Sequence, residues 1–162
     1  MSSERKFFSL LLSGALMLAA GGCSKKVAGE NDPKQRLVDY IAQSFKVSDV
    51  RDREKLIAFL SGGAKNRLVA WSDEQFREAF VDTKRQFIKL AIREVKSLSD
   101  TETNVTYELT YTDQGKGVDA RVTHKRMCEL VLENNQWFIR EVHNIKELIE
   151  YKNEMSLQVG KF

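Results

Sequence analysis

The side chains most capable of chemistry alternate along two neighbouring segments in the C-terminal third of the chain: His124, Arg126, Cys128, Glu141 and His143. A histidine beside a carboxylate is suited to general acid–base catalysis, because the imidazole titrates near neutral pH. His124 or His143 with Glu141 is therefore the candidate catalytic pair. The alternative is a charge-balanced rim in which Arg126, Glu141 and His143 satisfy one another without reacting.

Two strands joined at Asn134-Asn135 would position these side chains. Asparagine tolerates positive φ, so the pair predicts a two-residue hairpin turn. The resulting register places Cys128 opposite Glu141 and Arg126 opposite His143, and cross-strand partners share a face. A β-bulge in the first strand would instead turn its polar residues outward.

The same register gives the opposite face of the hairpin a half-apolar character, with Met127, Val131 and Phe138. An apolar surface of this kind is typical of an interface. We expect it to be covered by a second copy of the chain, by an envelope protein partner or by the C-terminal tail.

Further pocket candidates are Tyr107 and Tyr111, together with Arg126 and Cys128. The tyrosines are equally typical of an aromatic core. Two histidines without HExxH or CxxC spacing predict no metal site, and no cofactor motif is present. Cys128 is flanked by apolar residues, which indicates a buried thiol.

The composition is that of a folded domain, with 42% hydrophobic and 30% charged residues. A chain of 162 residues indicates one domain. The net charge of +3 is small and dispersed along the sequence, which argues against a nucleic-acid partner.

Residues 1–22 have the organisation of a signal peptide. Arg5 and Lys6 precede an apolar run over 7–20. As a helix this run would rise about 21 Å, short of the ~30 Å hydrocarbon core of a bilayer. We therefore expect a cleaved secretion signal and no permanent membrane span.

The sequence Ala20-Gly21-Gly22-Cys23 resembles the lipobox of bacterial lipoproteins. The resemblance implies a diacylglyceryl group on the Cys23 thiol, cleavage before Cys23, and a polar tether over 23–31. Ser24 then implies the outer membrane, facing the periplasm, in a Gram-negative cell. The alternative is an ordinary signal peptide with an incidental cysteine.

Helical signals dominate the first half of the folded part. Asp32-Pro33 is a helix start, and a second helix is predicted from Val50 to about Leu60, ended by Gly62-Gly63. Ser72 to Gln75 has capping-box spacing. Beyond Phe87 the apolar period becomes two, which predicts strands.

From Ile145 to about Met155 the spacing is helical again. Helices followed by hairpin-linked strands predict an α+β fold with an antiparallel sheet.

The order of these elements and the segment ENNQWFIREV (Glu133–Val142) resemble the nuclear transport factor 2-like superfamily over residues 32–145. A cystatin-like sheet is the competing fold. The resemblance implies N-terminal helices in the concave face of a curved sheet of about four strands, with a short C-terminal helix. The domain would span 32–155, leaving 156–162 as a tail.

The resembled superfamily places acids, bases and histidines at the open end of its cone, but none of its catalytic motifs matches this chain residue by residue. We therefore expect a lipid-anchored, non-catalytic binding or accessory module of the cell envelope. The alternative is a small-molecule isomerase or hydro-lyase that uses the His/Glu pair.

Overall fold

The computed structural model describes residues 31–117 and 120–151. The predicted signal peptide, Cys23, all but the last residue of the tether, and the tail at 156–162 lie outside these residues. In the described part, four α-helices precede four strands: α1 Pro33–Ser44, α2 Arg53–Ile57, α3 Gly62–Ala70, α4 Asp73–Phe76, β1 Arg85–Ser97, β2 Glu102–Asp113, β3 Ala120–Glu133 and β4 Gln136–Tyr151. A 3₁₀ turn, η1 (Val50–Asp52), and a π-helical turn, η2 (Arg77–Val81), complete the helical half.

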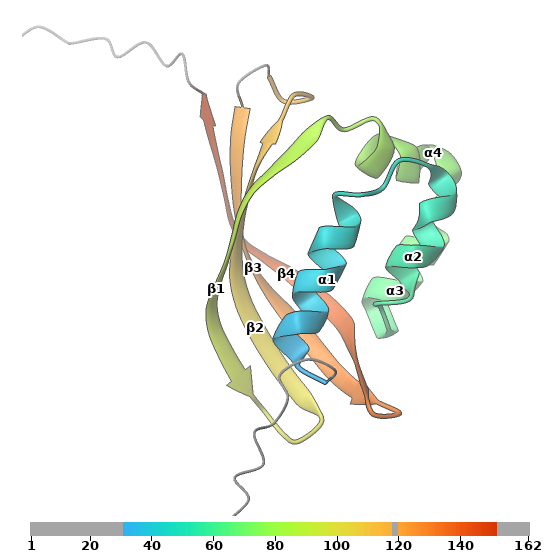
Figure 1. Cartoon of the computed structure of the whole chain (residues 1–162), viewed down its shortest axis with the longest axis vertical. Coiled ribbons are helices and arrows are strands. Elements are labelled where there is room, and N and C mark those ends of the chain that lie inside the picture. Colours follow the sequence, from blue (N-terminus) through green and yellow to red (C-terminus); the bar gives the residue numbers. More distant parts are fainter. Residues whose placement is uncertain (1–30, 118–119, 152–162) are drawn as a thin grey trace, which may run out of the picture.

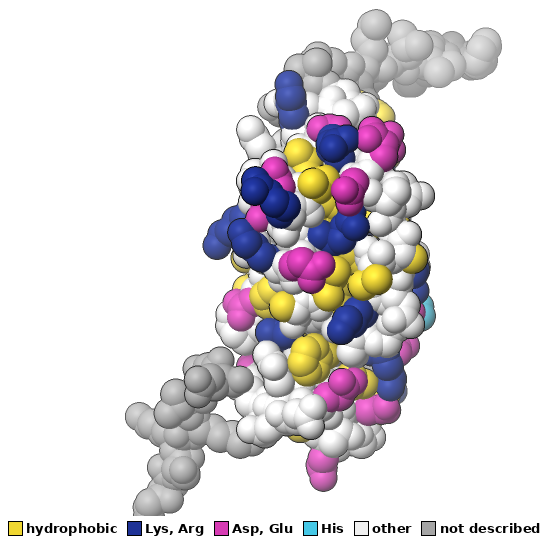
Figure 2. All heavy atoms as spheres, turned by 90° about the vertical axis from the view of Figure 1, so that its right-hand side faces the viewer, with side chains coloured by type: hydrophobic (Ala, Val, Ile, Leu, Met, Phe, Trp, Pro, Cys, Tyr) yellow, Lys and Arg dark blue, Asp and Glu magenta, His cyan; other side chains and the backbone are white. Residues whose placement is uncertain are grey.

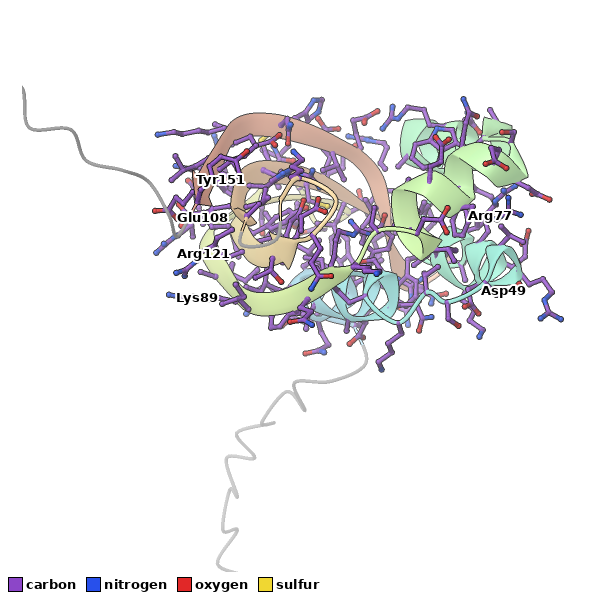
Figure 3. The ribbon with its side chains drawn as sticks, turned by 90° about the horizontal axis from the view of Figure 1, so that it is seen from above. Asp49, Arg77, Lys89, Glu108, Arg121 and Tyr151 are labelled. Atoms are coloured by element: carbon purple, nitrogen blue, oxygen red, sulfur yellow. The ribbon has the colours of Figure 1, made fainter. Side chains whose placement is uncertain are left out.

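The strands form one antiparallel sheet in the order β1-β2-β3-β4 (Figure 1). All four helices lie on one side of it; α1 and α3 both pack against β4, and α2 packs against these two helices. Seen from above, the sheet curls into an arc, with Lys89, Glu108 and Arg121 at the side away from the helices (Figure 3). The α+β architecture predicted from the sequence, with helices in the concave face of a curved sheet, is confirmed.

Two predicted helix starts are confirmed with their capping interactions. The Asp32 carboxylate accepts the backbone N–H of Lys34 at 2.9 Å, and Pro33 is the first helical residue. Ser72 and Gln75 form a reciprocal capping box at the start of α4. These caps depend on residues close in sequence, which is why the sequence alone reveals them.

The helix predicted from Val50 to about Leu60 is confirmed as far as Ile57, as the turn η1 followed directly by α2, but its predicted end at Gly62-Gly63 is wrong. Helix α2 ends at Ile57, and Leu60 forms a parallel β-bridge with Ile139 of β4. Gly62 begins α3 at φ +49°, and a Cβ there would meet Cγ of Arg140 at 2.9 Å. Glycine is thus needed where the chain leaves the sheet edge and enters a helix against it.

The predicted C-terminal helix is also wrong for residues 145–151, because β4 continues through them to Tyr151. Thr123 faces Leu148 and Val122 faces Ile149 in the β3–β4 pairing. A register shift leaves Ile145 unpaired, and this extra residue breaks the two-residue period. The spacing of the apolar residues therefore imitates a helix. Residues 152–155 of that prediction lie outside the described part.

The hydrophobic core fills the space between the helices and the concave face. Leu37 of α1, Leu56 of α2, Phe76 of α4, Val105 of β2 and Ile139 of β4 are each 0% exposed. Helix α1 presents Leu37 and Ile41 at helical spacing, the shorter helices each add one buried apolar residue, and the strands supply alternate residues from one face. On the helical side of the molecule, apolar side chains are exposed between positively and negatively charged side chains (Figure 2).

Candidate functional site

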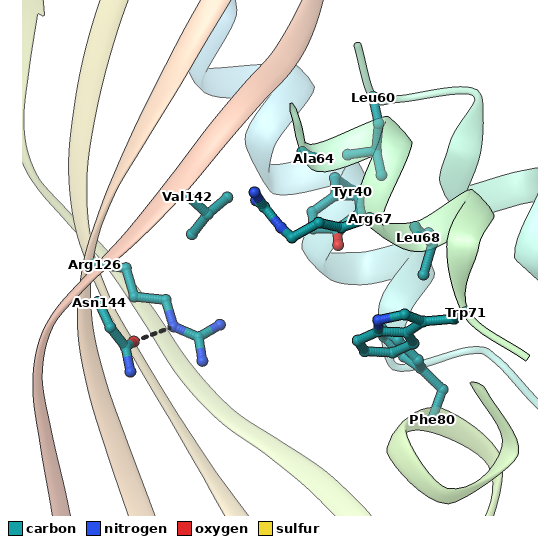
Figure 4. A pocket seen from close by; sticks show the side chains of 10 residues that line it. All are labelled: Tyr40, Leu60, Ala64, Arg67, Leu68, Trp71, Phe80, Arg126, Val142 and Asn144. Atoms are coloured by element: carbon teal, nitrogen blue, oxygen red, sulfur yellow. Dashed lines mark hydrogen bonds between the residues drawn. The ribbon is translucent and has the colours of Figure 1, made fainter. Parts of the chain in front are cut away.

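A cavity of about 380 Å³ lies between the helices and β3–β4 (Figure 4). Its described lining comes from α1, from α3 and the residues just before and after it, from η2 and from the two strands: Tyr40, Leu60, Ala64, Arg67, Leu68, Trp71, Phe80, Arg126, Val142 and Asn144. The size is at the small end of ligand pockets, and a mainly apolar wall with a few polar groups is typical of them.

The helical wall of the cavity is aromatic and aliphatic. Leu60 and Leu68 are buried, and the Trp71 and Phe80 rings lie 6.1 Å apart. Phe76 stacks on Phe80 at 4.9 Å from behind and holds that ring in place. The capping box at Ser72 starts the turn that brings Trp71 and Phe80 to the same side. This wall is therefore positioned by both local capping and core packing.

The sheet wall is polar and centres on Arg126 of β3. Its Nε donates to Oδ1 of Asn144 at 2.9 Å, an interaction drawn in Figure 4. One of its Nη atoms donates to Nδ1 of His124, two residues along the strand. Asn144 is the register partner of Arg126 on β4, so the sheet itself supplies the residue that orients the guanidinium.

His124 lies in the sheet beside this site but does not line the cavity. It is 6% exposed and contacts the Tyr111 hydroxyl at 3.4 Å and the Glu147 carboxylate at 3.5 Å. Burial, together with the charge of Arg126, holds the pKa of His124 below its usual value. The imidazole is therefore favoured in its neutral form.

The sequence predicts that Glu141 and His143 lie opposite Cys128 and Arg126, on the same face of the hairpin as His124. This prediction is wrong. The register follows prediction from the turn as far as Leu130 opposite Ile139, and then shifts, so that Glu129 faces Glu141 and Met127 faces His143. The bulge adds one residue in β4, not in β3 as considered from the sequence. One extra residue reverses the faces of those that follow.

After the bulge, the two candidates lie in different surroundings. His143 lies on the outer face and bonds Glu129 at 2.9 Å. Glu141 reaches α3 at the sheet edge, where the Arg67 guanidinium binds its carboxylate and lowers the pKa of Glu141 to about 2. The three candidate catalytic residues are therefore not brought together.

The four pocket candidates have different positions. Tyr107, Tyr111 and Cys128 are 2%, 7% and 0% exposed and belong to the core. Burial raises the pKa of Tyr107 and of the Cys128 thiol, so both are neutral. Only Arg126 lines the cavity.

The helical half of the lining is not among the site residues that the sequence predicts. Tyr40 lies on α1 and Phe80 on η2, and their local sequence does not distinguish either ring from an ordinary core residue. Arg67 and Trp71 lie in and after a helix whose apolar pattern is weak. Their shared position depends on long-range packing, for which the local sequence carries no signal.

The apolar set on the outer face is less open than the sequence indicates. Val131 is 7% exposed, and Met127 and Phe138 are half-buried. Near these residues the Arg140 guanidinium donates hydrogen bonds to the carboxylates of Glu102, at 2.8 Å, and Glu129, at 3.3 Å. An interface there, with a second copy or an envelope protein, stays a prediction.

Among residues 31–117 and 120–151, no group of three or more His, Cys, Asp or Glu side chains is arranged to hold a metal ion. Within the same residues, no helix is both long enough and apolar enough to span a bilayer.

Comparison with known proteins assigns the chain to no group. No protein-family model matches it, and no curated protein matches it.

Proposed function

We propose that this protein is a lipid-anchored, non-catalytic binding module of the cell envelope that takes a small ligand into the cavity between its helices and its sheet. The cavity is the observation that carries the proposal. Leu68, Trp71 and Phe80 give it an apolar wall, and Arg126 gives it an oriented charged group. An apolar cavity with a few convergent polar groups is the usual form of a ligand site.

The lining favours binding over the isomerase or hydro-lyase alternative. General acid–base catalysis needs a proton-transferring group within hydrogen-bond reach of the substrate. No histidine, aspartate or glutamate is among the described residues that line the cavity. An enzyme using His124 would have to act through Arg126, because His124 itself does not line the cavity.

The anchor is proposed from the lipobox at Cys23, and the outer membrane from Ser24. Two or three acyl chains hold a protein stably on a membrane, whereas one binds weakly. Cells grown with labelled palmitate should incorporate the label into the wild-type protein and leave it in the membrane fraction. Label in a Cys23→Ser protein would contradict the anchor.

The superfamily resemblance is part of the same proposal. Helices lying in the concave face of a curved, sequentially ordered antiparallel sheet support it. A cavity at the wide side of such a cone would serve as the ligand site.

Binding in the cavity can be tested with N-phenyl-1-naphthylamine, an uncharged apolar fluorophore that brightens when it leaves water. Ala64→Trp places an indole in the cavity, because Ala64 is in its lining. Val69→Trp adds the same indole on α3 at a position that is 55% exposed. We expect Ala64→Trp to weaken binding at least about tenfold and Val69→Trp to leave it unchanged. Equal binding by both variants would contradict the proposed site.

A further inference from the structure

Arg126 has more hydrogen-bond donors than the described residues can satisfy. A guanidinium carries five N–H groups, and the described contacts use one from Nε, to Asn144, one from an Nη atom, to His124, and one toward the hydroxyl of Tyr107. No carboxylate of the described residues forms an ion pair with it. The guanidinium is held by these contacts and extends toward the helices across the cavity (Figure 4), with N–H groups left over.

The other polar groups around the cavity also act mainly as donors. Trp71 presents its indole nitrogen toward this space, and Tyr40 its hydroxyl (Figure 4). Burial raises the pKa of Tyr40, so the hydroxyl keeps its proton. Neither group has a hydrogen-bond partner among the described residues. The Oδ1 acceptor of Asn144 is already used by Arg126.

The balance of charge around the site is positive. Arg67, the second arginine of the lining, is neutralised by Glu141. Near His124, three cations, Arg126, Lys116 and Arg85, face one carboxylate, Glu147, which already pairs with Lys116. The charge of Arg126 therefore has no counterion of its own in the described part of the chain.

We propose that the cavity binds a small amphipathic organic acid in its ionised form. Its acidic group accepts hydrogen bonds from the free Nη groups of Arg126, and its apolar part lies against Leu68, Trp71 and Phe80. A carboxylate suits this site because it is acceptor-only and matches the guanidinium fork. This inference rests on the proposed function, since it names the class of ligand for the same cavity.

The test compares two fluorophores that differ in one charged group. 1-Anilinonaphthalene-8-sulfonate is N-phenyl-1-naphthylamine with a sulfonate, which here represents the acidic group. Titrations use the wild-type chain, Arg126→Gln, Arg126→Lys and the matched control Arg121→Gln. Arg121 lies on the same strand and is exposed, so its replacement makes the same change in net charge.

We expect the anionic probe to bind more tightly than the neutral one, and Arg126→Gln to weaken it about 10- to 100-fold, because a charge-assisted hydrogen bond is lost. The neutral probe should bind Arg126→Gln within about twofold of wild type, which also shows that the variant keeps its cavity. Arg126→Lys should recover part of the loss, and Arg121→Gln should match wild type. Octanoate should displace the anionic probe, and 1-octanol should not.

Two outcomes overturn the inference in distinguishable ways. If both probes bind equally and Arg126→Gln affects neither, the ligand is not an anion, and the proposed function stands. If Ala64→Trp affects neither probe, the cavity is not the site, and the proposed function falls with the inference.

Discussion

Arg126 donates a hydrogen bond to Nδ1 of His124, two residues before it on β3. Arginine has no acceptor, so Nδ1 must carry the lone pair and the proton of neutral His124 must be on Nε2. That proton points toward Tyr111 and Glu147. The chain of contacts fixes the guanidinium of Arg126 and at the same time disfavours protonation of the imidazole that holds it.

The stability of the protein should therefore depend on pH through His124. Its folded-state pKa is below the unfolded value of about 6.5, so the unfolded chain binds the proton first as the pH falls. Stability is full above about pH 6.5 and decreases as the pH falls toward the folded-state pKa.

Urea titrations at about pH 7.5 and 5.5 measure this decrease. His124→Gln keeps an acceptor for Arg126 but does not titrate, so its free energy of unfolding should fall less between the two conditions. Equal decreases in the two proteins would show that His124 does not contribute.

Truncation of Phe76 should cause the largest loss of stability on the helical side. The ring is 0% exposed, stacks on Phe80 at 4.9 Å and has the Arg53 guanidinium over its face at 4.9 Å. We expect Phe76→Ala to lower the free energy of unfolding by about 3–5 kcal/mol. The control Val69→Ala, at a position 55% exposed, should change it by no more than about 0.5 kcal/mol. Denaturant unfolding of both variants provides the comparison.

The hairpin turn should tolerate glycine better than alanine. Asn134 and Asn135 have φ of 49° and 62°, a region that costs other non-glycine residues about 1–2 kcal/mol. Asn135→Ala should lower the melting temperature, whereas Asn135→Gly should leave it unchanged or raise it. A melting temperature for Asn135→Ala equal to that of Asn135→Gly would contradict the left-handed conformation.

The Cys128 thiol should be inert in the folded protein. It is 0% exposed, and burial raises its pKa, so little reactive thiolate forms. In a Cys23→Ser chain it is the sole cysteine, since the sequence has two. A thiol reagent such as dithionitrobenzoate should give no colour with the native protein and full colour in guanidinium chloride. Rapid native labelling would place the thiol at the surface.

Properties that depend on neighbouring residues could be predicted from the sequence. The caps at Asp32 and Ser72 and the turn at Asn134-Asn135 each depend on a few adjacent side chains. Val105, Tyr107, Leu109 and Tyr111 alternate with polar residues in the sequence, as on a strand with one buried face, and all four are buried. The order of helices and strands then limited the architecture to an α+β fold.

The candidate site depended on long-range interactions. The bulge in β4 near Glu141 is fixed by the approach of residues 59–61 and α3 to the sheet edge, where Ile139 pairs with Leu60. Because of that single extra residue, His143 lies on the outer face and Glu141 forms an ion pair with Arg67. Alternation along a strand predicts faces only while no residue is inserted.

The sequence by itself thus determined the helix starts, the turn and the buried strand face, and its resemblance to a lipobox is the basis on which we propose the anchor at Cys23. The tertiary structure decided that Arg126, and not a His/Glu pair, faces the cavity. The physical reason is that the cavity joins α1, α3, η2 and two strands. Packing between distant segments, together with one shift in register, sets which side chains meet there.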